Sequence, residues 1–275
     1  MNSGCEERLY REFDKKPTPS KTVSYSPVAS EQIYSPEEIA CLTPEKIPQH
    51  ISIIMDGNRR WATQRGLPPI MGHWKGADTL TRIVRAASEL DIKILTVYAF
   101  SKENWQRPKE EVDALMYIYK TYLESEREPM VREGVRLSTI GDLSAFPESV
   151  IEALEISQSM TAHCRTIDLV MAFNYGGRDD IRRAFISMME DCEKGKLSKQ
   201  QITEDMIGRY LDTAHYPDPD ILIRTSGEKR QSNFLLWQLS YSEFYHTDVL
   251  WPDFDERELL KAVCEYQKRN RRFGG

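Results

Sequence analysis

Short apolar runs alternate with longer amphipathic stretches from about residue 50 to the end of the chain. Five runs, rich in β-branched or aromatic residues, have the length of a buried strand: 51–55, 94–100, 135–140, 167–173 and 221–225. The stretches between them have the apolar period of helices. This alternation predicts an α/β fold in which a largely parallel sheet carries helices on its faces.

Two of the helical stretches have a well-defined apolar face. The first follows the first strand and carries a continuous stripe, which we expect to pack on the sheet: Leu80, Ile83, Val84, Ala87 and Leu90. The second is expected to begin at Pro108, because proline is tolerated at the first helical position, and Glu110 and Glu111 follow where the helix dipole favours negative charge. Further helices are expected over residues 147–160, 178–193, 203–211 and 255–270.

The first 48 residues differ from the rest in texture. They contain six prolines among Ser, Thr, Lys and Glu, with no sustained apolar period. This composition predicts an N-terminal extension, flexible or loosely packed, ahead of a folded region over 49–275. The first 14 residues lack the apolar run of a secretory signal, and no stretch approaches the roughly 20 apolar residues that span a bilayer. We therefore expect a cytoplasmic protein.

Charge and cysteine content exclude several classes of protein. The formal net charge of -6 argues against general nucleic-acid binding, which needs a basic surface. The cysteines are odd in number and lack the paired spacing of zinc sites or redox dithiols, so we expect reduced thiols: Cys5, Cys41, Cys164, Cys192 and Cys264. An anionic ligand must therefore meet a local basic cluster.

Such clusters follow three of the predicted strands. The segments are DGNRRWA from residue 56, SKENWQRP from residue 101 and RTSGEKRQS from residue 224. Ligands of open parallel sheets gather at the carboxyl ends of strands. Glycine lets the backbone approach a ligand closely, and arginine binds phosphate oxygens with two parallel hydrogen bonds. The pattern predicts a site for an anionic head, and the aromatic in the second segment suits an apolar tail.

Commoner phosphate motifs are missing from the sequence. There is no G-x-x-x-x-G-K-[ST], which leaves a P-loop kinase or ATPase unsupported, and no G-x-G-x-x-G to mark a dinucleotide fold. Instead, DGNRRWA, YAFSKENWQRP, NYGGRDDI, IRTSGEKRQSNFLLWQ and TDVLWPDFDE resemble, in this order, the signature segments of cis-prenyltransferases such as undecaprenyl diphosphate synthase. The resemblance covers residues from about 48 to 275, and RRFGG at the end resembles the Arg-x-Gly tail of catalytically competent members. The aspartate-rich motif of trans-type prenyl synthases is absent, since Asp179-Asp180 is followed by Ile-Arg-Arg.

The resemblance implies a fold and an activity. The fold would be a single α/β domain with a mostly parallel six-stranded sheet, flanked by helices and containing a hydrophobic tunnel, with residues 49–275 as the catalytic domain. The activity would be magnesium-dependent condensation of isopentenyl diphosphate onto an allylic diphosphate such as farnesyl diphosphate, giving a long-chain product such as undecaprenyl diphosphate, the lipid-carrier precursor for cell-wall glycans. It also implies a homodimer with peripheral contact at the inner face of the membrane.

The resemblance also implies roles for individual residues. Asp56 would engage magnesium and the allylic diphosphate, with Glu243 as the second magnesium-associated acid. Asn104 would act in proton removal, by orienting a proton path because an amide is a poor base. The residues around the allylic diphosphate would be Gly57, Asn58, Arg59, Arg60, Trp61 and His73. The loop over the second substrate would supply Ser101, Lys102, Glu103, Trp105 and Arg107, and the clamp on isopentenyl diphosphate would be Arg224, Arg230, Gln231 and Ser232.

Other interpretations of the same residues remain open. Asp56 could cap a helix, Trp61 could belong to the core, and Glu243 could be a surface glutamate. A magnesium-dependent phosphatase or phosphotransferase would also use Asp and Arg, and a non-catalytic partner subunit would keep the fold but lose the Asp56 loop or the tail. Two positions depart from the family. Pro69 stands where an arginine is usual, with Arg65 as a candidate substitute, and Arg59 stands where many members have glycine.

Overall fold

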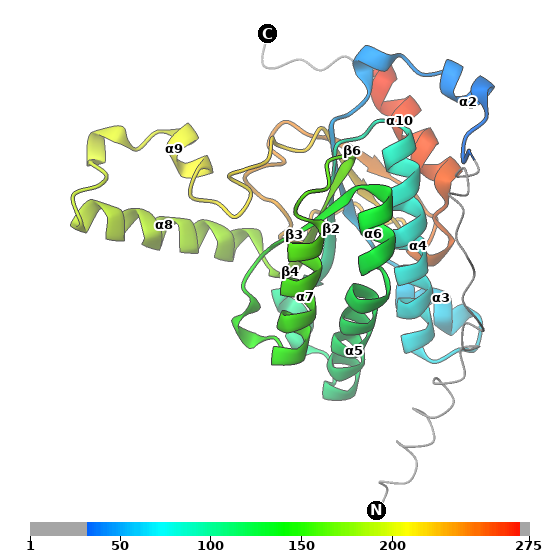
Figure 1. Ribbon diagram of the computed structural model, residues 1–275, viewed down its shortest axis with the longest axis horizontal. Coiled ribbons are helices and arrows are strands. Elements are labelled where there is room, and N and C mark those ends of the chain that lie inside the picture. The colour runs from blue at the N-terminus through cyan, green and yellow to red at the C-terminus, as the bar shows by residue number, and fades with distance from the viewer. Residues whose placement is uncertain (1–31, 270–275) are drawn as a thin grey trace, which may run out of the picture. The chain divides into compact units, whose positions relative to one another are not determined.

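A six-stranded, wholly parallel sheet forms the centre of the protein (Figure 1). The computed structural model describes residues 32–269; Cys5 and the RRFGG tail lie outside them. The strand order is β3-β4-β2-β1-β5-β6. The strands are β1 (His50–Ile54), β2 (Ile94–Ser101), β3 (Val135–Ile140), β4 (Ile167–Tyr175), β5 (Ile221–Arg224) and β6 (Glu243–His246). The predicted single α/β domain with six strands is confirmed.

Helices precede and follow the strands and cover the sheet. The α-helices are α2 (Pro36–Ala40), α3 (Asn58–Gln64), α4 (Pro69–Glu89), α5 (Lys109–Ser125), α6 (Arg127–Glu133), α7 (Glu148–Thr161), α8 (Gly177–Glu193), α9 (Glu204–Gly208) and α10 (Glu256–Lys268). Short 3-10 turns are η1 (Pro44–Lys46), η2 (Lys102–Gln106), η3 (Leu143–Ala145), η4 (Lys199–Gln201) and η5 (Trp251–Asp253). Among residues 32–269, no helix combines the length and the apolar character that crossing a membrane requires.

The five strands predicted from apolar runs all form, within two residues of their expected ends. The apolar stripe of α4 is also confirmed, since all five of its residues are buried. Three helix predictions need adjustment. Pro108 lies just before α5 and not within it, a second helix, α6, follows α5 after Glu126, and the expected helix over 203–211 is only the short α9.

Apolar side chains lie on both faces of the sheet, as expected for a parallel sheet. The larger core packs α4, α5, α7 and α10 on one face, with Ile53, Leu95 and Leu169 among its strand residues. The smaller core includes Ile54 and Val170 from the strands and Phe234 from the β5–β6 connection. The strands are therefore shielded from water on both sides, and their carboxyl ends remain accessible through loops.

The described part of the expected extension is packed and not loose. Tyr34 is 1% exposed, and its hydroxyl donates to the Glu256 carbonyl at 2.9 Å. The backbone N–H groups of Ile33 and Tyr34 donate to the Glu89 carboxylate at 3.0 and 2.8 Å. The compact unit accordingly begins at Ile33. One buried aromatic and a few hydrogen bonds hold this segment, so its sequence has no apolar period from which its packing could be predicted. The boundary of the catalytic domain at residue 48 stays a prediction.

Candidate active site

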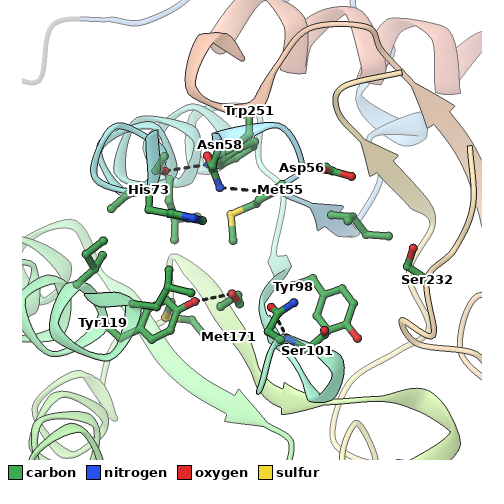
Figure 2. A pocket seen from close by; sticks show the side chains of 18 of the residues that line it. Met55, Asp56, Asn58, His73, Tyr98, Ser101, Tyr119, Met171, Ser232 and Trp251 are labelled. Carbon is green, nitrogen blue, oxygen red and sulfur yellow. Dashed lines mark hydrogen bonds between the residues drawn. The ribbon is translucent and has the colours of Figure 1, made fainter. Parts of the chain in front are cut away.

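A cavity of about 650 Å³ opens at the carboxyl ends of β1, β2 and β5. Its polar lining comprises Asp56, Asn58, His73, Ser101, Glu103, Asn104, Arg107, Arg224, Arg230, Ser232 and Asn233. Its apolar and aromatic lining includes Met55, Leu80, Tyr98, Leu115, Ile118, Tyr119, Tyr122, Met171 and Trp251. In Figure 2, Asp56 and Ser232 lie on one side of the cavity and Tyr119 on the other. The cavity thus combines a charged region with an apolar wall.

Arg224 organises the charged region. The β1–β5 register pairs Ile54 with Arg224, so Asp56, two residues beyond Ile54, lies beside the end of β5. Arg224 Nη2 donates to Asp56 Oδ2 at 2.8 Å, and Nη1 donates to Ser232 Oγ at 2.6 Å and to the Arg230 carbonyl. Arg224 is only 3% exposed, and a buried guanidinium needs such partners. The predicted residues Asp56, Arg224, Arg230 and Ser232 therefore meet in one place.

The turn after β1 requires glycine. Gly57 has φ +106°, and a Cβ there would lie 3.0 Å from the Leu250 side chain and 3.1 Å from that of Ser226. The turn directs Asn58 into the cavity, where its Oδ1 is buried without a hydrogen-bond partner among the described residues. A buried acceptor of this kind is available to a bound ligand, ion or water.

His73 supplies a second orphan. It lies inside α4, and its Nε2 is buried without a hydrogen-bond partner in the described chain. Burial, and then the positive charges of Arg107 and Arg59, lower its pKa from 6.5 to about 4. Glu111 Oε1 lies 3.7 Å away, beyond hydrogen-bond distance, so burial prevails and the imidazole is neutral at pH 7.

Four residues predicted around the allylic diphosphate do not line the cavity: Gly57, Arg59, Arg60 and Trp61. Glu111 holds Arg59 at 3.5 Å, and Arg60 donates to the Ser226 carbonyl at 2.9 Å. Trp61 Nε1 donates to Asp253 Oδ1 at 2.7 Å.

Arg65, the candidate substitute for the arginine that is missing at Pro69, points to other partners in the described chain. It lies over the Trp61 ring, 4.3 Å from its centroid, and pairs with Asp253 at 3.0 Å. It is absent from the cavity lining, and Pro69 is the first residue of α4.

In the loop after β2, too, some of the predicted residues line the cavity and others do not. Ser101, Glu103, Asn104 and Arg107 line the cavity, and the Ser101 N–H donates to Asn104 Oδ1 at 3.1 Å. Lys102 and Trp105 do not line it. Lys102 pairs with Asp179 at 3.1 Å, whereas the Trp105 ring packs on Phe100 and donates to Asn174 at 2.8 Å. Gln231, next to Arg230, donates to the Phe234 carbonyl at 3.0 Å and also lies outside the lining.

The described chain does not bring Glu243 to Asp56. Glu243 begins β6 and pairs in register with Ile221, level with Ile51 at the start of the sheet. Asp56 lies five residues further along, just past the end of β1, which is roughly 16 Å at the rise of a strand. Glu243 instead accepts from Arg269 at 2.7 Å. Within residues 32–269, no group of three or more His, Cys, Asp or Glu side chains could hold a metal ion.

Some lining residues were not predicted as site residues. Tyr119, from the apolar face of α5, is one of them: it reaches the cavity, and its hydroxyl donates to the Ala99 carbonyl at 2.6 Å. Met171 and Tyr98 lie within β4 and β2, where successive side chains point to opposite faces of the sheet and only some of them face the cavity. Asn233 directly follows Ser232 in the signature segment, and that adjacency was its only signal.

Comparison with known proteins assigns this fold and cavity to a class, the prenyltransferases. The chain belongs to the family described as putative undecaprenyl diphosphate synthase, whose model matches residues 54–274. It is 50% identical over 239 residues to an isoprenyl transferase of Clostridium perfringens, covering 87% of this chain and 94% of that protein. An isoprenyl transferase of Agrobacterium fabrum is 48% identical over 232 residues, covering 84% and 94%.

Two solved structures have the same fold. Lavandulyl diphosphate synthase from Lavandula x intermedia, in complex with dimethylallyl diphosphate, superposes with a TM-score of 0.82 at 40% identity and covers 84% of this chain and 100% of its own. A probable undecaprenyl diphosphate synthase from Campylobacter jejuni gives a TM-score of 0.70 at 34% identity, covering 83% and 99%. These likenesses confirm the family resemblance found in the signature segments.

Proposed function

We propose that this protein condenses isopentenyl diphosphate repeatedly onto an allylic diphosphate, farnesyl diphosphate being the expected primer. The product would be a long-chain polyprenyl diphosphate, with undecaprenyl diphosphate, the lipid-carrier precursor for cell-wall glycans, as the expected length. The observation that carries the proposal is the buried Arg224, which joins Asp56, Arg230 and Ser232 in the polar region of a cavity that also has an apolar wall. Such a cavity matches a diphosphate with a prenyl tail.

Charge compensation is the main task of this site. Two diphosphates held side by side repel each other strongly, and fixed cations in a partly dry cavity offset that repulsion. Arg107, Arg224 and Arg230 supply such cations, and the neutral His73 adds a hydrogen-bonding ring without further charge. The orphan Oδ1 of Asn58 and Nε2 of His73 are suited to a bound ligand or its water.

The residues present fit a magnesium ion shared with substrate. Magnesium is usually held by one or two carboxylates together with substrate phosphates, so a cluster of acids is not required. Asp56 meets this need, because only its Oδ2 accepts a hydrogen bond from the described residues and its side chain is 31% exposed. When bound, magnesium would neutralise the allylic diphosphate and assist its departure. The geometry of the described chain gives no support to Glu243 in this role.

The remaining chemistry concerns positions and one proton. As the allylic C–O bond breaks, the double bond of isopentenyl diphosphate attacks the allylic carbon, and loss of a proton leaves a new cis double bond. Asn104 is a poor base, but its oxygen is held by the Ser101 N–H, which leaves its NH₂ group to orient the acceptor of that proton. The apolar wall, including Leu115, Ile118 and Tyr119, would hold the growing tail as one side of a tunnel.

We also propose a homodimer that acts in the cytoplasm and contacts the membrane peripherally to release its product. Helix α8 supports the dimer, because Phe185, Ile186 and Met189 are 62%, 43% and 50% exposed and are neighbours on the helix surface. An exposed apolar patch on a helix is typical of an interaction surface. Light scattering of the purified protein, with Phe185→Glu as the disrupting variant, tests this assignment.

The proposed reaction is tested by feeding labelled isopentenyl diphosphate with farnesyl diphosphate and magnesium, followed by chromatography of the products. We expect elongated polyprenyl diphosphates from the natural protein and none from Asp56→Ala. Release of inorganic phosphate without elongation would favour a phosphatase or phosphotransferase. Absence of any turnover would favour a non-catalytic partner subunit.

A further inference from the structure

Three loops at the carboxyl edge of the sheet meet at one side chain, that of Asn233. This residue lies in the β5–β6 connection, next to Ser232, and lines the cavity. Its φ of +61° places it in the left-handed region, which among residues with a side chain Asn and Asp adopt most readily. The first loop that it contacts leads from β4 into α8, and the second follows β2.

Asn233 caps helix α8 from outside that helix. The Gly177 N–H donates to the Asn233 carbonyl at 2.6 Å, and the Arg178 N–H donates to Asn233 Oδ1 at 3.0 Å. The first N–H groups of a helix need outside acceptors, and Gly176, the residue before α8, has no side chain to provide one. A Cβ at Gly176 would lie 2.8 Å from Asn233 Nδ2, so glycine is what lets Asn233 approach.

The other end of the Asn233 amide contacts the loop after β2. Its Nδ2 donates to Glu103 Oε1 at 3.0 Å. Although burial opposes ionisation of Glu103, hydrogen bonds from Asn233, the Glu103 backbone and Ser101 lower the pKa of its carboxyl group. Asn233 therefore donates to a carboxylate, which makes a stronger hydrogen bond than a neutral acceptor would.

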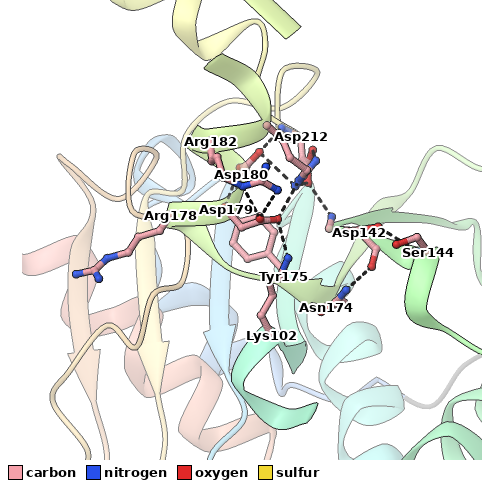
Figure 3. A network of polar contacts seen from close by, with 12 residues as sticks. Lys102, Asp142, Ser144, Asn174, Tyr175, Arg178, Asp179, Asp180, Arg182 and Asp212 are labelled. Carbon is pink, nitrogen blue, oxygen red and sulfur yellow. Dashed lines mark hydrogen bonds and ion pairs between the residues drawn. The ribbon is translucent and has the colours of Figure 1, made fainter. Parts of the chain in front are cut away.

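A second contact joins the same two loops nearby. Lys102, next to Glu103, pairs with Asp179 in the first turn of α8 at 3.1 Å, and Figure 3 shows both in the polar network at the start of that helix. The network therefore anchors the loop after β2 to α8, and Asn233 attaches the β5–β6 connection to both.

We propose that Asn233 is a positioning residue that sets the spacing between the Arg230–Ser232 segment and the loop after β2, and thereby the fit of isopentenyl diphosphate between them. This inference rests on the proposed function. The position needs an acceptor toward Arg178, a donor toward Glu103 and a left-handed backbone, and asparagine provides all three. Aspartate keeps the backbone and the cap, but it places a second carboxylate about 3.0 Å from that of Glu103.

The test is a double-mutant cycle with Asn233→Asp, Glu103→Gln and the pair together. We expect Asn233→Asp to raise KM for isopentenyl diphosphate at least tenfold, with a smaller change in KM for farnesyl diphosphate. In the Glu103→Gln background the same change should raise KM by less than threefold, because the glutamine NH₂ can donate to the introduced carboxylate, reversing the direction of the hydrogen bond. Asn233→Gly, which keeps the backbone but loses both side-chain contacts, should raise KM in either background.

Asp255→Ala is the matched control. Asp255 caps α10 by accepting from the Glu258 N–H at 2.9 Å and does not line the cavity. Its loss should lower the melting temperature without changing KM. Equal KM effects of Asn233→Asp in the two backgrounds would overturn the inference, as would an Asn233→Asp enzyme with unchanged KM. A natural protein that fails to elongate would instead contradict the proposed function, so the two failures are distinguishable.

Discussion

Replacement of Arg224 by lysine probes the contact on which the charged region depends. Arg224 donates to Asp56, to Ser232 and to the Arg230 carbonyl, and it is almost fully buried. Lysine keeps the charge but cannot reproduce the planar fork, so we expect two of these hydrogen bonds to be lost. Hydrogen bonds to charged groups contribute about 1.5 kcal/mol or more each, about 3 kcal/mol for two. We expect this loss to act on the positioning of Asp56 and Ser232 in the transition state, which corresponds to roughly a hundredfold fall in kcat/KM for isopentenyl diphosphate.

The assay is steady-state elongation with labelled isopentenyl diphosphate at saturating primer and magnesium. Arg136→Lys is the matched control, because Arg136 makes a comparable fork with Asp168 and does not line the cavity. The control should lose stability but keep kcat/KM. An Arg224→Lys enzyme within threefold of the natural protein would refute the central position given to this guanidinium.

Three further predictions concern the buried His50, the first described residues and the cavity wall. Burial lowers the pKa of His50 to about 4, so the unfolded chain binds the extra proton first. The contribution of neutral His50 to stability is complete above pH 6.5 and is lost as pH falls toward 4, on the order of 3 kcal/mol. Chemical denaturation at pH 7 and pH 5 should therefore show a smaller fall in unfolding free energy for His50→Gln than for the natural protein. The exposed His215→Gln should keep the full fall. Tyr34→Phe should lower the free energy of unfolding by about 1 kcal/mol, and an unchanged denaturation midpoint would contradict the packing of residues 33–48. Tyr119→Ala should enlarge the cavity and lengthen the products seen by chromatography, whereas an unchanged product distribution would contradict its place in the wall.

The fold was largely predictable because strands buried on both faces are apolar throughout. β6 was not found from its pattern, since it has four residues and only Tyr245 among them is buried. The anchoring of Tyr34 was also missed, because it depends on contacts with Glu89 and Glu256, far away in the chain.

The site was predictable to the level of segments but not of side chains. The resemblance located the loops that carry Asp56, Asn104 and Arg224, and each of these residues lines the cavity. Whether a neighbouring side chain points away from the cavity depends on its partners elsewhere in the fold. Trp61, for example, donates its indole N–H to Asp253. The distance of Glu243 from the cavity depends on strand register, which a sequence segment alone does not reveal.

A crystal structure with isopentenyl diphosphate and an unreactive analogue of the allylic diphosphate tests the central claim most directly. The account predicts both diphosphates at the carboxyl ends of β1, β2 and β5, with oxygens of one within hydrogen-bond distance of Arg230 and Ser232. The prenyl tail should lie along Leu115 and Tyr119. Diphosphates bound elsewhere, with this cavity filled only by water, would contradict it.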